Sequence, residues 1–175
     1  MLLDLTTIRQ PETPVDRTMA PETFAPDDEF RLVAPAHLVG TLHKDESRYR
    51  LEGRVTTEVE LACSRCAEPY RMPVAGAFEL RFLPQALAGN KDEDPESDPT
   101  TSFYADDAID LAQVVREQCY LAIPMKPLCT PDCQGLCSTC GINLNTERCQ
   151  CAPTWTDPRL AVLQTLASAR TNDDA

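Results

Sequence analysis

Two stretches in the first half of the chain alternate between apolar and polar residues with a period of two. In the first, the apolar side carries Tyr49, Leu51, Gly53, Val55, Thr57, Val59 and Leu61. In the second, it carries Tyr70, Met72, Val74, Phe78, Leu80 and Phe82. A period of two is typical of a β-strand with one buried face. The two stretches therefore predict a long antiparallel hairpin whose tip contains Cys63-Ser64-Arg65-Cys66.

Charges on the polar side of this hairpin distinguish two registers that bury the same residues. One register places Glu52 opposite Arg81, with Leu61 facing Met72. A shift by two residues places Glu52 opposite Glu79 instead. Because like charges directly opposite each other destabilise a strand pair, the sequence predicts the first register.

Weaker patterns surround the hairpin. Short strands are predicted at residues 2–8, 30–33 and 36–43. Residues 10–29 are rich in proline and charge, which predicts a poorly ordered arm. Residues 84–101 are acidic and poor in apolar side chains, which predicts a loop.

A helix is predicted at residues 110–122. Asp110 is a good N-cap, and Gln113 three residues later completes a capping box. An apolar stripe that includes Cys119 follows, and Pro124 ends the helix. Cys119 is therefore interpreted as a core residue.

A second helix is predicted near the C-terminus, where proline follows the potential N-cap Asp157. Its apolar positions are Leu160, Leu163, Leu166 and Ala167, with Trp155 just before it. The predicted fold class is α+β: an antiparallel sheet with a long hairpin, one central helix, a cysteine-rich zinc-binding segment and a C-terminal helix. The predicted parts are 1–29, a strand and arm; 30–124, the sheet body; and 125–175, the zinc segment and last helix.

Six of the nine cysteines lie between Cys129 and Cys151. The N-terminus lacks the basic start and apolar core of a signal peptide, so a cytoplasmic location is expected. In a reducing compartment, clustered cysteines favour metal binding over the alternatives, a disulfide cluster or free buried thiols. Setting Cys119 aside leaves eight cysteines, enough for two zinc sites with four thiolates each.

The eight predicted zinc ligands divide into two groups by position. We expect one site from Cys63, Cys66, Cys129 and Cys133. We expect the other from Cys137, Cys140, Cys149 and Cys151, in which Gly141 lets the backbone turn behind a ligand. A zinc site filled by four thiolates has no open position for water or substrate and is structural.

No catalytic site is predicted. His37 and His43 lie in or near a strand and are interpreted as solvent-facing, and Asp106 and Asp107 as favourable charge before a helix. Phosphate-binding loops and nucleophile motifs are absent. The net charge of −12 lies mostly at residues 12–29, at 91–98 and in the tail, so a basic surface for phosphates is not evident.

Several short motifs together resemble the YceD family of bacterial large-subunit ribosomal RNA accumulation proteins. In chain order they are Leu61-Ala62-Cys63-Ser64-Arg65-Cys66, Ile109-Asp110-Leu111 with Glu117, Ala122-Ile123-Pro124-Met125-Lys126-Pro127-Leu128-Cys129, Asp132-Cys133-Gln134-Gly135-Leu136-Cys137, Cys140-Gly141 with Asn143-Leu144-Asn145, and Asp157-Pro158-Arg159-Leu160. The resemblance implies a role in making, processing or stabilising large-subunit ribosomal RNA. The implied partner is that RNA or a basic large-subunit ribosomal protein, with no membrane and no small-molecule substrate.

A thiol redox protein that uses Cys63 and Cys66 is the alternative hypothesis. Such a protein places a C-x-x-C motif at the start of a helix, where the helix dipole lowers a thiol pKa. Here the pair lies between two predicted strands, which favours the zinc interpretation.

Overall fold

The structure is a computed structural model, which describes residues 1–25, 29–87 and 100–151. Two compact units make up the chain. The sheet unit comprises Met1–Ser64 and Glu68–Cys129, and the cysteine-rich unit comprises Arg65–Ala67 with the described residues from Thr130 onward. The predicted C-terminal helix and Trp155 lie outside the described residues, as does most of the predicted acidic loop.

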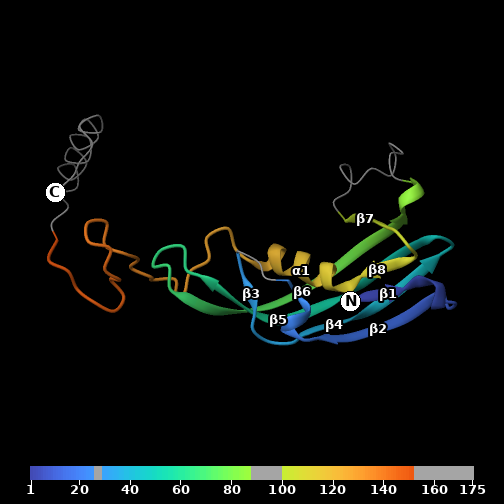
Figure 1. The fold of residues 1–175 in the computed structure, drawn as a ribbon, viewed down its shortest axis with the longest axis horizontal. Coiled ribbons are helices and arrows are strands. Elements are labelled where there is room, and N and C mark those ends of the chain that lie inside the picture. Colours follow the sequence, from blue (N-terminus) through green and yellow to red (C-terminus); the bar gives the residue numbers. More distant parts are fainter. Residues whose placement is uncertain (26–28, 88–99, 152–175) are drawn as a thin grey trace, which may run out of the picture. The chain divides into compact units, whose positions relative to one another are not determined.

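The sheet unit is built on a six-stranded sheet (Figure 1). In spatial order its strands are β2 (Glu12–Met19), β4 (Ala36–Asp45), β5 (Arg48–Ala62), β6 (Pro69–Pro84) and β7 (Thr101–Tyr104), while β3 (Arg31–Leu32) also pairs with β5. The predicted hairpin is confirmed as β5 and β6. The pairing of β7 with β6 is parallel, so the sheet is mixed and not purely antiparallel as predicted.

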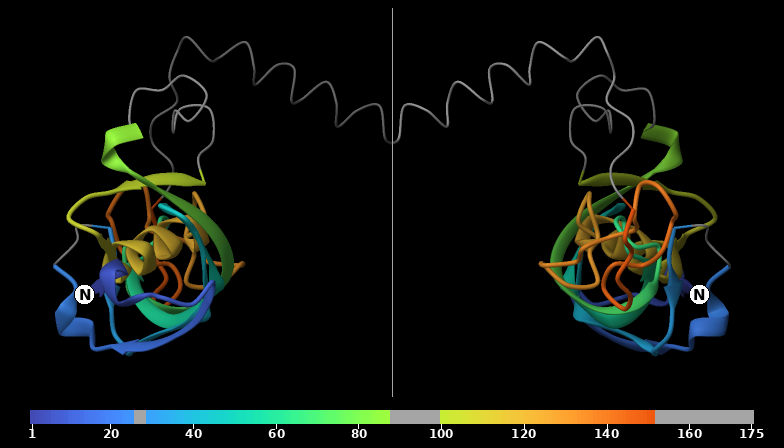
Figure 2. Two further views of the ribbon diagram at one scale, coloured as in Figure 1. Left: turned by 90° about the vertical axis from the view of Figure 1, so that its right-hand side faces the viewer. Right: turned by 90° about the vertical axis from the view of Figure 1, so that its left-hand side faces the viewer.

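A single α-helix, α1 (Leu111–Ala122), occurs among the described residues and lies on the concave side of this curved sheet (Figure 2). Its buried side chains Leu111, Val114, Val115 and Cys119 share one core with β4, β5 and β6. A two-stranded sheet of β1 (Leu2–Asp4) and β8 (Ala108–Asp110) precedes the helix. Short 3-10 turns occur at Leu5–Thr7, Pro21–Thr23 and Gln85–Leu87. Within the described ranges, no helix has the length and apolar character needed to cross a membrane.

The start of α1 confirms half of the predicted capping box. The Asp110 carboxylate accepts a hydrogen bond from the Ala112 N–H at 3.0 Å, as an N-cap should. The Gln113 side chain does not turn back to the cap; its amide donates to Glu117 at 2.9 Å, one turn along the helix. The side-chain hydrogen bond from Gln113 to Glu117, one helical turn away, therefore replaces the expected bond from Gln113 back to the N-cap.

The register predicted for the hairpin is wrong. Glu52 lies opposite Glu79, and Leu61 lies opposite Tyr70, which is the shifted alternative. The tip explains the choice, because the Cys63 N–H donates to the Glu68 carbonyl at 2.9 Å and closes the loop in this register.

The charge cost of this register is reduced by diagonal pairs. Arg50 reaches Glu79 at 3.4 Å, and Arg71 reaches Glu58 at 3.8 Å, although neither pair is directly opposite. Long side chains reach diagonal neighbours across a strand pair. A comparison of directly opposite charges alone therefore overestimates the free-energy difference between the two registers.

The predicted poorly ordered arm is also wrong over residues 12–19, which form β2. This strand pairs with β4 from Glu12↔His43 to Met19↔Ala36. Val15 and Met19 are each only 2% exposed and anchor the strand in the core. Proline and charge do not prevent a strand at the edge of a sheet, where Pro14 lies.

Two glycines allow β4 and β5 to approach closely. Gly40 lies opposite Gly53 in the strand pair. A Cβ atom added at Gly40 would lie 2.3 Å from the Glu52 carbonyl oxygen, and one at Gly53 would lie 2.6 Å from that of Val39. These backbone approaches exclude any side chain at either position, as at other strand glycines where two backbones come close.

Candidate metal centre

The structure brings the eight predicted ligand cysteines together in two groups of four. The first is Cys63, Cys66, Cys129 and Cys133, and the second is Cys137, Cys140, Cys149 and Cys151. In each group, all the sulfur atoms lie within 4.8 Å of one another. The geometry therefore matches the division expected from the sequence, while the role of these residues as metal ligands stays a prediction.

The first group contains a tight loop at the hairpin tip. The Cys63 N–H donates to the Glu68 carbonyl at 2.9 Å, and the Ser64 N–H donates to the Pro127 carbonyl at 2.8 Å. Ala67, directly after the second cysteine of the pair, has a left-handed φ of 59°. This conformation reverses the chain behind the two sulfurs.

The second group contains a loop of the same shape. The Cys137 N–H donates to the Ile142 carbonyl at 2.8 Å, in the same relation as Cys63 to Glu68. Gly141 has a φ of 75° and takes the place that Ala67 has in the first loop. Two C-x-x-C loops thus share one backbone design, with the same N–H to carbonyl closure and a left-handed residue after the second cysteine.

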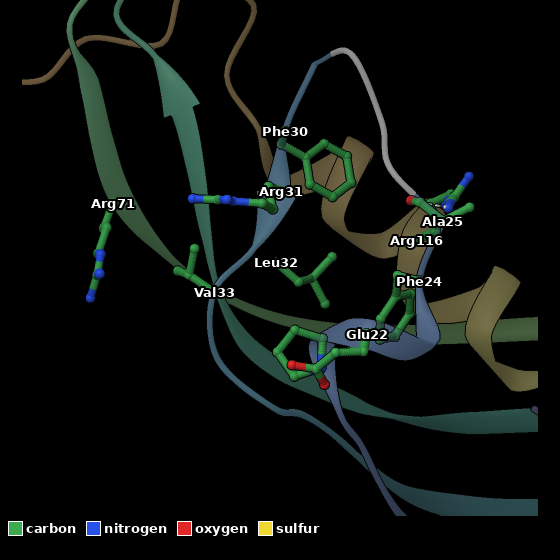
Figure 3. Close-up of a pocket in the computed structure, with 10 residues that line it drawn as sticks. Glu22, Phe24, Ala25, Phe30, Arg31, Leu32, Val33, Arg71 and Arg116 are labelled. Atoms are coloured by element: carbon green, nitrogen blue, oxygen red, sulfur yellow. Dashed lines mark hydrogen bonds between the residues drawn. The ribbon is translucent and has the colours of Figure 1, made fainter.

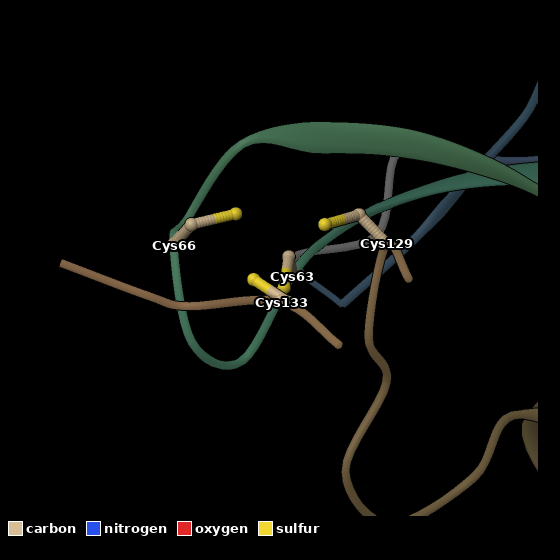
Figure 4. Close-up of side chains that lie close together, drawn as sticks. All are labelled: Cys63, Cys66, Cys129 and Cys133. Carbon is tan, nitrogen blue, oxygen red and sulfur yellow. The ribbon is translucent and has the colours of Figure 1, made fainter. Parts of the chain in front are cut away.

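Figure 4 shows the first group, in which the sulfur atoms of Cys66 and Cys129 point toward each other. Three of its cysteines are nearly inaccessible, with Cys63 3%, Cys66 4% and Cys133 2% exposed. The loops around Cys133 are held by two further side chains, which the sequence did not identify as part of the site.

Those two side chains are Arg65 and Asn145. The Arg65 guanidinium donates to the Cys133 carbonyl at 2.8 Å. The Asn145 amide donates to the Cys133 sulfur at 3.3 Å. The signal for Asn145 is its turn-forming sequence Asn143-Leu144-Asn145, and the only signal for Arg65 is its place within the C-x-x-C motif. Outer partners of this kind orient metal ligands.

The second group is more accessible. Cys140 and Cys151 are exposed, and Cys137 and Cys149 are intermediate. Hydrogen bonds from the Cys140 and Thr139 backbone amides lower the pKa of Cys137 to about 6. The pKa of Cys151 is raised to about 12, first because its thiol donates to the Cys140 sulfur.

The two shifts run in opposite directions, because backbone amides stabilise the Cys137 thiolate and the hydrogen bond to Cys140 stabilises the protonated Cys151 thiol. A cation bound by all four sulfurs would displace these protons, as metal binding to cysteines does.

The donor set fits zinc. A tetrahedral ion with Zn–S bonds of about 2.3 Å places its sulfurs about 3.8 Å apart, within the 4.8 Å limit that both groups satisfy. Four soft sulfur donors also favour zinc over magnesium or calcium, which prefer oxygen. In each group, all four positions of such an ion would be filled by the chain.

Cys119 belongs to neither group. It lies fully buried on the core side of α1, and burial raises its pKa to about 11. The interpretation of this residue as a core thiol is confirmed.

The two histidines lie on the sheet. His43 contacts two carboxylates, with its Nε2 at 2.7 Å from Glu52 and its Nδ1 at 3.5 Å from Glu12. His37 bonds Thr18 at 3.0 Å. His43 is thus half-buried in a polar cluster and not simply solvent-facing, as the sequence suggested.

Asp106 and Asp107 lie in the loop that joins β7 to β8. Both have left-handed φ angles, 52° and 49°, and they make the turn between β7 and β8. The turn leads into β8 and then into α1, so both aspartates come before the helix, where the sequence placed them.

A pocket of about 460 Å³ is present in the sheet unit, beside β3 (Figure 3). Its apolar lining includes Phe24, Phe30, Leu32 and Val33. Of its three arginines, Arg31 pairs with Glu60, Arg71 pairs with Glu58, and Arg116 donates to a backbone carbonyl. Because these guanidinium groups have protein partners, the pocket is a weaker candidate site than the cysteine groups.

Comparison with known proteins relates the chain to ribosomal RNA accumulation proteins. A chloroplastic protein of Zea mays, described as large ribosomal RNA subunit accumulation protein YCED homolog 1, is 34% identical over 131 residues. The match covers 61% of this chain and 45% of the relative. The large ribosomal RNA subunit accumulation protein YceD of Haemophilus influenzae is 32% identical over 78 residues, covering 45% of this chain and 44% of the relative. An uncharacterized protein of Mycobacterium tuberculosis is 36% identical over 96 residues, covering 54% of this chain and 44% of the relative.

The chain thus spans less than half the length of these relatives. No solved structure matches it. The family model described as large ribosomal RNA subunit accumulation protein YceD matches residues 51–167, which is more than half of the chain and includes all eight grouped cysteines. The chain therefore belongs to the YceD family.

Proposed function

We propose that this protein is a non-catalytic, zinc-stabilised factor in the synthesis, processing or stability of large-subunit ribosomal RNA. Family membership and the names of the relatives support the ribosomal part of the proposal. The observation that carries the zinc part is the convergence of eight cysteines in two groups of four.

The cysteine-rich unit needs such a stabiliser. Between Thr130 and Cys151, the only buried residues are Cys133 and Gly135, so this described stretch has no apolar core of its own. Ordering a residue costs about 1–2 kcal/mol in backbone entropy alone. Zinc binding supplies about 10–16 kcal/mol in small finger peptides, a favourable free energy that opposes this entropy cost.

A structural role for the metal follows from the ligand count. Zinc that catalyses a reaction keeps a position open for water or substrate, whereas structural zinc is enclosed by four protein ligands. Each cysteine group offers four sulfurs, so neither would leave an open position. This supports a factor that binds and positions other molecules and does no chemistry on them.

The partner we propose is large-subunit ribosomal RNA or a basic ribosomal protein of that subunit. The chain is acidic overall, with a net charge of −12. On the outer face of the hairpin, Arg50 and Arg71 are paired with glutamates. A surface of this kind attracts basic proteins more readily than phosphates.

The alternative, a thiol redox protein, finds less support. Cys63 and Cys66 lie at the tip between β5 and β6, and no helix begins at either residue. Both are buried, whereas a reactive cysteine pair is partly exposed.

The test is complementation in cells that lack this protein. We expect a lowered ratio of large- to small-subunit ribosomal RNA, restored by the wild-type chain and by Cys119→Ala, which leaves both cysteine groups intact. Cys66→Ser should not restore the ratio. Equal restoration by Cys66→Ser and wild type would contradict the proposal, and crosslinking of the wild-type chain would show whether RNA or protein is contacted.

A further inference from the structure

The two cysteine groups differ in accessibility. In the first group, Cys63, Cys66 and Cys133 are at most 4% exposed. In the second, Cys140 and Cys151 are exposed. If both bind metal, as proposed above, an oxidant in solution reaches the sulfurs of the second group far more easily.

The supports of the two groups also differ. Around the first, the Cys63 and Ser64 amides, the Arg65 guanidinium and the Asn145 amide all make hydrogen bonds. The four ligands of this group come from two stretches that are far apart in the sequence, residues 63–66 and 129–133.

The second group lies in one short segment, residues 137–151. Its described loop contacts are mostly internal, such as Cys137 N–H to the Ile142 carbonyl and Gly141 N–H to the Cys137 carbonyl. A disulfide between two of its sulfurs would link residues of this segment alone and would involve neither the loop between β5 and β6 nor Cys129.

We propose that Cys137, Cys140, Cys149 and Cys151 form a peroxide-sensitive modification site that loses its metal reversibly, while the Cys63 group keeps its metal. The inference rests on the proposed zinc binding. It assigns the two sites different roles: a permanent structural site and a site that reports oxidation.

The chemistry needs only hydrogen peroxide as co-reactant. One thiolate attacks a peroxide oxygen, the O–O bond breaks, and a sulfenic acid and a hydroxide ion form. A second thiolate then attacks the sulfenic sulfur, which forms a disulfide and releases a second hydroxide ion. Two sulfurs have been oxidised and one peroxide reduced, and the zinc ion, having lost two ligands, dissociates.

The test uses the full-length protein carrying two zinc ions. Peroxide is added in stoichiometric amounts, zinc release is followed with a chromogenic chelator, and cysteines are mapped by differential alkylation and mass spectrometry. We expect one zinc per chain to leave in a fast phase, at least about tenfold faster than the second, because susceptibility follows exposure. Disulfides should appear only among the second group, and a thiol reductant with added zinc should restore the site.

Two variants separate the outcomes. Cys151→Ser should lower the zinc content to one per chain and remove the fast phase, whereas Cys66→Ser should retain the fast phase. Release of both ions at one rate, or disulfides first at Cys63 or Cys66, would overturn the inference. Mapping on the wild-type protein decides the question even if Cys66→Ser does not fold. Protein that contains no zinc before peroxide is added would instead refute the proposed function.

Discussion

At the residue scale, Ala67 and Gly141 occupy the same place in two loops of the same design. Each follows the second cysteine of a C-x-x-C pair, and both have a left-handed φ, 59° and 75°. Glycine adopts this conformation freely, whereas a residue with a Cβ atom is strained in it. The first loop therefore carries a cost that the second avoids.

This comparison predicts opposite effects of two substitutions. Ala67→Gly should raise the unfolding free energy by up to about 1 kcal/mol, because it relieves the backbone strain of a left-handed residue. The gain is partly offset because glycine loses more conformational entropy on folding. Gly141→Ala should lower it by about 1–2 kcal/mol, because its Cβ would meet no atom within 4 Å and only the backbone strain remains.

Denaturant unfolding of the zinc-loaded protein measures both effects. A loss of stability in Ala67→Gly would show that the two loops differ in backbone conformation. The result would also weaken the inference that one design serves both cysteine groups.

At the element scale, the Gly40–Gly53 pair controls the approach of β4 to β5. Gly40→Ala should lower the unfolding free energy by about 1–3 kcal/mol or more, as overpacking does, because its Cβ would lie 2.3 Å from a backbone oxygen. Gly76→Ala in β6 is a matched control, since a Cβ there meets nothing within 4 Å. Thermal unfolding compares the two, and equal stability of both variants would contradict the close approach.

The N-cap of α1 gives a prediction that depends on pH. Partial burial by itself raises the pKa of Asp110, but hydrogen bonds from the N-terminal ammonium and from the Ala112 and Gln113 amides outweigh it and lower the pKa below its ordinary value of 3.8. The stabilisation is therefore fully present above the ordinary value and is lost as the pH falls through the folded-state pKa.

Two variants test this cap. Asp110→Ala should cost about 1 kcal/mol of stability at neutral pH, and Asp110→Asn, which can still cap, should cost less. The difference between wild type and Asp110→Asn should shrink below about pH 4. A difference that stays constant down to pH 2 by denaturant unfolding would exclude a role for the Asp110 charge.

The elements that could be predicted from sequence are those with long or specific patterns. The β5–β6 hairpin and α1 repeat their apolar period often enough to be recognised, and both are confirmed. The register could not be predicted from charge, because hydrogen bonds at the Cys63–Glu68 tip and diagonal ion pairs decided it. The edge strand β2 was missed because only Val15 and Met19 mark its buried face within a polar stretch.

At the scale of the whole molecule, spacing in the sequence indicates cysteine pairs, whereas the joining of Cys63 and Cys66 to Cys129 and Cys133 was a hypothesis that the geometry matches. A sequence cannot show that one group is buried and the other exposed, because burial depends on segments that meet only in the fold. The outer partners Arg65 and Asn145 were missed for the same reason. Pairs of cysteines in the sequence thus indicate a candidate metal site, but they do not indicate the residues that would support it.

The most direct test of this account is the metal content of protein purified without chelator. Elemental analysis should find about two zinc ions per chain, and X-ray absorption should find four sulfur neighbours at about 2.3 Å. Cys119→Ala should leave the zinc content unchanged, since Cys119 belongs to neither group. Metal-free protein, or protein whose grouped cysteines are joined in disulfides, would contradict the account.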